Sequence, residues 1–162
     1  LQSPLAPMTS SGVWKRISRL PLDLMKMWSP CSAEMVFGTY GFLDTGLVYL
    51  PSQGGGMTQV AQVALGIGRR FSDGTFHGNF RMSRNGNSNG LEFESTGFTV
   101  NPDCTGTFNW RVLGIPGGII QERLLIVDRG NEMWSMCVNS GVPTQKRVSI
   151  SIHKRISPVA AQ

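Results

Sequence analysis

The sequence predicts an all-β protein, an antiparallel up-and-down barrel of about eight strands preceded by a short helical segment. The first observation is compositional, because only 15% of the 162 residues are charged and 20 are glycine, which is typical of turn-rich β proteins. The second is a pattern: from Cys31 onward, apolar residues recur at every second position in short runs. The length suits one domain with one hydrophobic core.

The expected strands are separated by short stretches rich in glycine, asparagine and proline, which favour tight turns. Gly66 and Gly68 interrupt one run and predict a bulge or a sharp bend there. The runs cover residues 34–42, 45–50, 58–71, 75–83, 91–100, 105–113, 119–128, 132–138 and 146–156. Strands joined by short turns pair with their chain neighbours. A sheet of this length splits into a sandwich or closes into a barrel, and closure is favoured because it removes exposed edges.

The chain divides into four parts. Residues 1–12 have the composition of a flexible leader, residues 13–30 form a helical segment, residues 31–156 form the barrel and residues 157–162 form a flexible tail. Apolar residues in the second part recur at steps of three and four, although Pro21 interrupts them. We interpret this segment as a cap on one end of the sheet; a helix that docks on a membrane surface or a partner is the alternative.

The charge pattern limits the classes of partner. The net charge is +5 and the pI is about 9.6, but the basic residues are scattered and no nucleic-acid motif is present, so we expect no nucleic-acid binding. No apolar run has the length of a membrane span, so we expect no stable membrane insertion. A homodimer is compatible with the sequence.

Three stretches resemble a pattern found in uncharacterised small bacterial proteins, most of them exported. They are CSAEMVFGTYGF (31–42), STGFTVNPDCTGTF (95–108) and LLIVDRGNEM (124–133), which contain a G-T-Y-x-F strand and a V-N-P-D-C-T-G-T corner. The resemblance implies a barrel like those of the calycins or of allene oxide cyclase. It implies little about activity, because no general activity is known for the group.

The chain has three cysteines, Cys31, Cys104 and Cys137. Taken alone, they fit one disulfide and one free thiol in an exported protein, or three reduced thiols in a cytoplasmic one. The resemblance implies a disulfide between Cys31 and Cys104 that fastens the first strand to the corner, and a periplasmic or extracellular location. The chain departs from the pattern at Phe98, where tyrosine is commoner, and in its extra Cys137.

Polar side chains share faces on several expected strands, and four of them are candidate catalytic residues: His77, Glu92, Glu94 and Asp128. Asp128 can share a face with Glu122. On an outer wall these groups would form weak surface ion pairs; inside the barrel, burial would shift their pKa values toward acid–base catalysis. A metal centre would have to combine His77 and His153 with a carboxylate, and we expect none. No cofactor-binding motif is present, and we expect no cofactor.

Large apolar side chains are abundant for so small a domain. They fill a packed core or line a cavity that adapts to an apolar ligand. The candidate ligand-binding residues are Tyr40, Phe76, Phe80, Met82, Phe93, Phe108, Trp110, Trp134 and Met136.

Three functions remain open. The first is lipocalin-like binding of a hydrophobic small molecule inside the barrel. The second is a cofactor-independent cyclase or isomerase that folds a polyene or polyketide-like substrate there. The third is an exported structural domain with a solid core.

Overall fold

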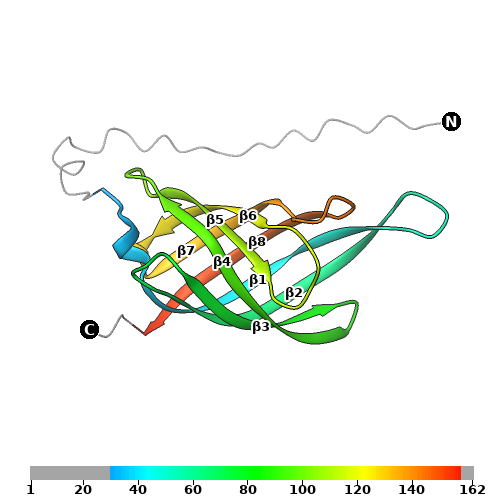
Figure 1. The fold of residues 1–162 in the computed structure, drawn as a ribbon, viewed down its shortest axis with the longest axis horizontal. Helices are drawn as coiled ribbons and strands as arrows, with labels where there is room; N and C mark the ends of the chain where they lie inside the picture. The colour runs from blue at the N-terminus through cyan, green and yellow to red at the C-terminus, as the bar shows by residue number, and fades with distance from the viewer. Residues whose placement is uncertain (1–29, 158–162) are drawn as a thin grey trace, which may run out of the picture.

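A computed structural model describes residues 30–157 of the chain. They form a closed barrel of eight strands with two short 3₁₀ turns (Figure 1). The strands are β1 (Gly38–Pro51), β2 (Met57–Arg70), β3 (Phe76–Arg84), β4 (Asn87–Val100), β5 (Thr105–Val112), β6 (Ile120–Val127), β7 (Glu132–Asn139) and β8 (Lys146–Ser157), and the turns are η1 (Ala33–Val36) and η2 (Asp128–Gly130). The expected leader, most of the helical segment and most of the tail lie outside the described residues.

Every strand pairs antiparallel with its neighbour in the chain, and β1 also pairs with β8 to close the cylinder. The predicted up-and-down barrel of about eight strands is therefore confirmed. Closure pairs every strand on both sides, so no edge strand remains. Within residues 30–157, no helix is long and apolar enough to cross a bilayer.

Two of the expected strand boundaries are wrong. The sequence suggested a break at Leu43 and Asp44, but β1 runs through both, because both keep partners on β2 and on β8. The stretch 84–90 was read as a turn, whereas only Asn85 and Gly86 form one, with positive φ angles of 48° and 82°.

The expected bulge at Gly66 and Gly68 is also absent, since β2 keeps a regular register with both neighbours there. These glycines make room for aromatic rings inside the barrel. A Cβ at Gly66 would lie 2.4 Å from the ring of Phe42, and one at Gly68 would lie 2.4 Å from the ring of Phe76. Such distances are far below van der Waals contact, so the rings lie directly against the backbone of β2.

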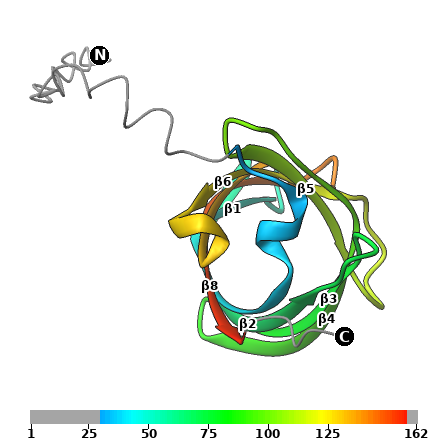
Figure 2. The same cartoon turned by 90° about the vertical axis from the view of Figure 1, so that its left-hand side faces the viewer.

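One end of the barrel is closed by the segment before β1. Figure 2 shows η1 lying across this end. The predicted disulfide between Cys31 and Cys104 is confirmed and fastens the segment to the β4–β5 corner, which is compatible with an exported protein. Tyr40 donates a hydrogen bond of 2.7 Å to the carbonyl of Gly130, and Arg155 donates to the Tyr40 hydroxyl and to the Met35 carbonyl. This end is therefore sealed by hydrogen bonds and a covalent bridge.

The outer wall has two different halves. The outward side chains of β1, β2, β7 and β8 are mostly apolar, and many are exposed: Leu43, Val63, Leu65, Ile67, Trp134, Met136, Val138, Val148, Ile150 and Ile156. The outward side chains of β3 and β4 are mostly polar, with His77, Asn79 and Arg81 exposed on β3. On β8, the apolar face of the strand therefore points away from the barrel interior.

The disulfide gives the first prediction. It closes a loop between residues 73 positions apart, and the chain-entropy model gives a loop of that length about 4 kcal/mol of stabilisation. We expect the double variant Cys31→Ser/Cys104→Ser to lose about that much free energy of unfolding in urea titrations. Reductant should shift the wild-type midpoint and leave the variant unchanged; an equal response of both proteins would contradict the prediction.

Candidate functional site

A cavity of about 150 Å³ occupies the half of the barrel away from η1. It reaches the β5–β6 and β7–β8 loops through Ile115 and Gln145, so its mouth lies opposite the sealed end. Its walls are of two kinds, aromatic and polar. The barrel interior is therefore neither solid nor uniformly apolar.

The aromatic wall comes mainly from inward positions of β3, β4 and β5. Phe80 and Phe93 each pack edge-on or tilted against Trp110, with ring centroids 6.2 and 5.9 Å apart. Phe108 stacks on Trp110 at 6.4 Å, and Phe42 meets Phe93 at 5.8 Å. These offset and edge-to-face arrangements are the ones that aromatic rings prefer. They present ring faces and edges to a guest molecule.

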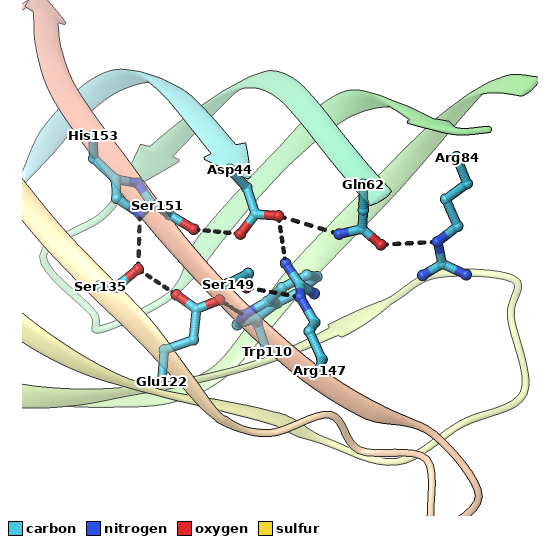
Figure 3. Close-up of polar contacts among 10 residues, drawn as sticks. All are labelled: Asp44, Gln62, Arg84, Trp110, Glu122, Ser135, Arg147, Ser149, Ser151 and His153. Atoms are coloured by element: carbon cyan, nitrogen blue, oxygen red, sulfur yellow. Dashed lines mark hydrogen bonds and ion pairs between the residues drawn. The ribbon is translucent and has the colours of Figure 1, made fainter. Parts of the chain in front are cut away.

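The polar wall is organised around the buried carboxylate of Asp44 on β1 (Figure 3). Its Oδ1 accepts a 3.1 Å hydrogen bond from Gln62 and pairs with the Arg147 guanidinium at 2.7 Å, while its Oδ2 accepts from the Ser151 hydroxyl at 2.7 Å. Gln62 in turn accepts a 2.8 Å bond from Nε of Arg84. Every partner comes from an inward position of β2, β3 or β8, so closure of the barrel assembles the network.

A second buried carboxylate, Glu122 on β6, also lines the cavity. It accepts hydrogen bonds from the Trp110 indole at 3.1 Å and from the Ser135 hydroxyl at 2.5 Å. Burial raises the pKa of Glu122 above its ordinary value, although the Ser135 bond and the nearby Arg147 charge oppose the rise. A carboxyl group in this setting can hold and release a proton.

His153 on β8 completes this part of the polar wall. Its Nε2 lies 3.4 Å from the Ser135 hydroxyl, and its ring lies 5.5 Å from that of Phe42. Its Nδ1 is buried and has no hydrogen-bond partner within residues 30–157. Burial lowers the pKa of His153 to about 3, and the charge of Arg70 adds to the effect. The imidazole is therefore neutral at physiological pH.

Arg70 lies at the end of β2 nearest η1 and is fully buried. None of its three side-chain nitrogens has a hydrogen-bond partner among the described residues. The guanidinium instead lies over two rings that line the cavity, 4.3 Å from the centroid of Phe76 and 4.7 Å from that of Phe108. Burial lowers the pKa of Arg70 to about 10, so it stays charged at neutral pH and makes the floor of the cavity electropositive.

Six of the nine predicted ligand-binding residues line the cavity: Phe76, Phe80, Met82, Phe93, Phe108 and Trp110. Tyr40 is buried but belongs to the sealed end. Trp134 and Met136 are 47% and 52% exposed on the outer wall, because Met133, Ser135 and Cys137 take the inward positions of β7.

The four predicted catalytic residues do not face the cavity. His77 and Glu92 are exposed on the outer wall. Glu94 is half-buried and forms an ion pair with the exposed Arg111, and Asp128 is exposed in η2. His77, Glu92 and Glu94 occupy outward strand positions beside the inward Phe76 and Phe93. The acid–base groups that line the cavity are instead Glu122 and His153. The sequence pointed to Glu122 only as a residue that can share a strand face with Asp128.

Sequence reasoning missed most of the polar wall. The missed residues are Asp44, Gln62, Arg84, Arg147, Ser149 and Ser151. One signal was present: residues 147, 149, 151, 153 and 155 are all polar, at every second position of one strand. His153 was considered only as a metal ligand together with His77, and the two lie on opposite sides of the wall. Among residues 30–157, no three His, Cys, Asp or Glu side chains are placed to hold a metal ion.

Cys137 is the remaining thiol and lies buried in the aromatic cluster beside the cavity. Burial raises its pKa, so the thiol stays protonated and weakly nucleophilic.

The comparisons with known proteins add little to this geometry. No family model matches the chain, and no curated protein matches it. Among solved structures, a match is found to one described as "Structure of EF1p2_mFAP2b bound to DFHBI", with a TM-score of 0.47 and 12% sequence identity, covering 76% of this chain and 95% of that one. A likeness this distant carries no functional argument.

The buried imidazole gives a prediction of pH dependence. Between pH 6.5 and about 3, folded His153 binds fewer protons than it does in the unfolded chain. The free energy of unfolding should therefore fall as the pH drops through this window, by up to about 1.4 kcal/mol per pH unit. His153→Phe removes this dependence and keeps the ring against Phe42. Urea titrations at pH 7, 6 and 5 should show a shallower decline for this variant.

The exposed His77 provides the control, because His77→Gln should follow the wild-type pH profile. Parallel profiles for wild type and His153→Phe would show that the imidazole is not held neutral.

Proposed function

We propose that this protein binds a small aromatic or alicyclic molecule with a polar edge inside its barrel. The observation that supports this is the two-sided cavity, with aromatic rings on one side and a hydrogen-bonded polar wall on the other. Small-molecule sites are typically concave and mostly apolar, with a few fixed polar groups that orient the guest. One end of the barrel is sealed, and the cavity opens between the loops at the other end. This arrangement suits the binding of a small molecule.

The size of the cavity supports a guest of about one ring. An apolar cavity of roughly 150 Å³ is large enough for benzene, and the cavity here has a similar volume, about 150 Å³. A ring that lies between Phe93 and the polar wall would contact Trp110 and place its substituents near His153 or the mouth. A longer guest would extend out between the β5–β6 and β7–β8 loops.

The polar wall is pre-organised, which favours binding. The Asp44 carboxylate is held by three donors, so its geometry does not have to be ordered when a guest arrives. Pre-organised groups lose less conformational entropy on binding. His153 also lines the cavity, and Nδ1 of its imidazole makes no hydrogen bond within residues 30–157.

Binding is tested by fluorescence. 4-Nitrotoluene, a one-ring quencher, should quench tryptophan emission saturably, because Trp110 lines the cavity. Ala64 also lines it, so Ala64→Phe should fill the space and weaken binding about ten-fold or more. Ala61→Phe is the matched control, since Ala61 is exposed on the same strand. 1-Nitropyrene, with four fused rings, should not bind. Equal, unsaturable quenching of all three proteins would contradict the proposal.

A second function, a cofactor-independent isomerase, is favoured by one observation: the buried Glu122, with its raised pKa, lines the cavity. A double-bond isomerisation moves one proton between two carbons of the same molecule and shifts the double bond with it. Glu122 as the carboxylate can take a proton from the carbon beside a carbonyl and return it to another carbon of the same molecule. A neutral His153 can accept or donate a hydrogen bond at the carbonyl.

The isomerase is tested with cyclohex-3-enone, a one-ring probe that becomes the conjugated cyclohex-2-enone when its double bond shifts. We expect wild type to raise the absorbance of the conjugated enone above the buffer rate, and Glu122→Gln to remove most of that gain. Glu122→Gln should still bind 4-nitrotoluene, which shows that the cavity is intact. Equal rates for wild type and Glu122→Gln would leave binding as the function.

A further inference from the structure

The charges inside the barrel are unequal. Three inward guanidinium groups, those of Arg70, Arg84 and Arg147, surround the cavity or underlie it, against two carboxylates, Asp44 and Glu122. His153 adds no positive charge at neutral pH, because its pKa is about 3. The interior therefore has a positive excess even with both carboxylates ionised.

Two of the three guanidinium groups already have other contacts inside the barrel. Arg147 is almost buried and pairs with Asp44 at 2.7 Å, and its Nε donates a 2.9 Å hydrogen bond to the Ser149 hydroxyl. Arg70 lies against ring faces on the side of the sealed end and is not part of the cavity lining. Arg147 also lines the cavity, but its charge is already paired with the Asp44 carboxylate, and Arg70 lies behind the rings that line it.

Arg84 is different. It lies at the last inward position of β3 and lines the cavity near the mouth. Its only side-chain hydrogen bond within residues 30–157 is from Nε to Gln62, which is neutral, and it forms no ion pair there. Its two terminal nitrogens, which together form the fork of the guanidinium, make no hydrogen bond to these residues.

The side chain of Arg84 is also held in place. Gln62 accepts the Nε bond through its carbonyl oxygen and donates through its amide nitrogen to Asp44 (Figure 3). Asp44 is fixed in turn by Ser151 and Arg147. This chain of hydrogen bonds orients the Arg84 guanidinium through its Nε. The two terminal nitrogens have no partner within residues 30–157.

Resting on the proposed binding function, we propose that the guest is a small aromatic or alicyclic carboxylate, with its ring against the aromatic wall and its carboxylate on Arg84 at the mouth. A planar guanidinium fork matches a carboxylate with two parallel hydrogen bonds. Leu91 and Met82 line the cavity together with Arg84, so they supply apolar contact close to the charge. Covering a half-buried cation with a neutral guest would remove its water without a replacement.

The inference is tested with cinnamate and with cinnamamide, a neutral molecule of nearly the same shape. Calorimetric titration of wild type should show cinnamate binding about ten-fold or more tighter than cinnamamide. Arg84→Gln should remove that preference, with little change for cinnamamide. Arg84→Lys keeps the charge without the fork and should retain only part of the preference. The control is Arg81→Gln, an exposed position on the outer face of the same strand, which should change neither affinity.

The outcomes separate this inference from the proposed function. If both compounds bind equally and Arg84→Gln changes neither, the guest is not selected as an anion, although the cavity still binds small rings. If Arg84→Gln and Arg81→Gln weaken cinnamate equally, the effect is one of overall charge and the assignment to Arg84 is wrong. If neither compound binds and 4-nitrotoluene also fails to bind, the proposed function itself is overturned.

Discussion

The space enclosed by eight closed strands is the constraint on which the structure depends. A barrel of this size holds side chains or one small guest, but not both at full size. Here β1, β3, β4 and β5 send large rings inward, and Phe42 and Phe76 fit because Gly66 and Gly68 on β2 bring no Cβ against them. On the opposite side, β8 contributes Ser149 and Ser151, which are buried and small. The cavity is the volume left between rings on one side and hydroxyl groups on the other.

Closure also determines how the interior polar groups are satisfied, because little water can reach them. Around Asp44 the protein supplies its own partners, and the acceptors of that carboxylate are filled by three side chains from two strands, β2 and β8. Farther from the mouth, the side-chain nitrogens of Arg70 and Nδ1 of His153 have no partner in the described part of the chain. Buried polar atoms without partners are costly and uncommon. The polar side chains near the mouth are therefore held by hydrogen bonds, whereas these deeper nitrogen atoms lack hydrogen-bond partners within residues 30–157. This contrast is typical of sites adapted to a ligand or a reaction.

The architecture was predictable and the orientation of several strands was not. Turn-forming residues and the period of two gave the strand count and the antiparallel order. On β8, however, the pattern is the same whichever face points inward. Val148, Ile150 and Ile152 share the apolar face, yet Ser149, Ser151 and His153 on the other face are the buried ones. The inward position of Asp44 was not predictable for a related reason: an aspartate next to a leucine in the middle of a strand resembles the end of that strand. Side-chain partners on neighbouring strands of the closed barrel decide both cases, and these can be far apart in the sequence: Ser151, which bonds Asp44, is 107 residues away.

The outward orientation of the apolar face of β8 also bears on function. If β8 turned its valine and isoleucines inward, the barrel would bury more apolar area and would no longer have to satisfy Arg147 and His153. Apolar burial is the main stabilising term in folding, so the observed arrangement gives up stability. Natural proteins accept such local costs mainly at functional sites. Most of the costly groups lie together: Asp44, Glu122, Arg147 and His153 line one cavity, and Arg70 lies against two rings of its lining. The loss of core is thus concentrated where a guest would be held, which is the distribution expected of a binding site and not of a structural shell.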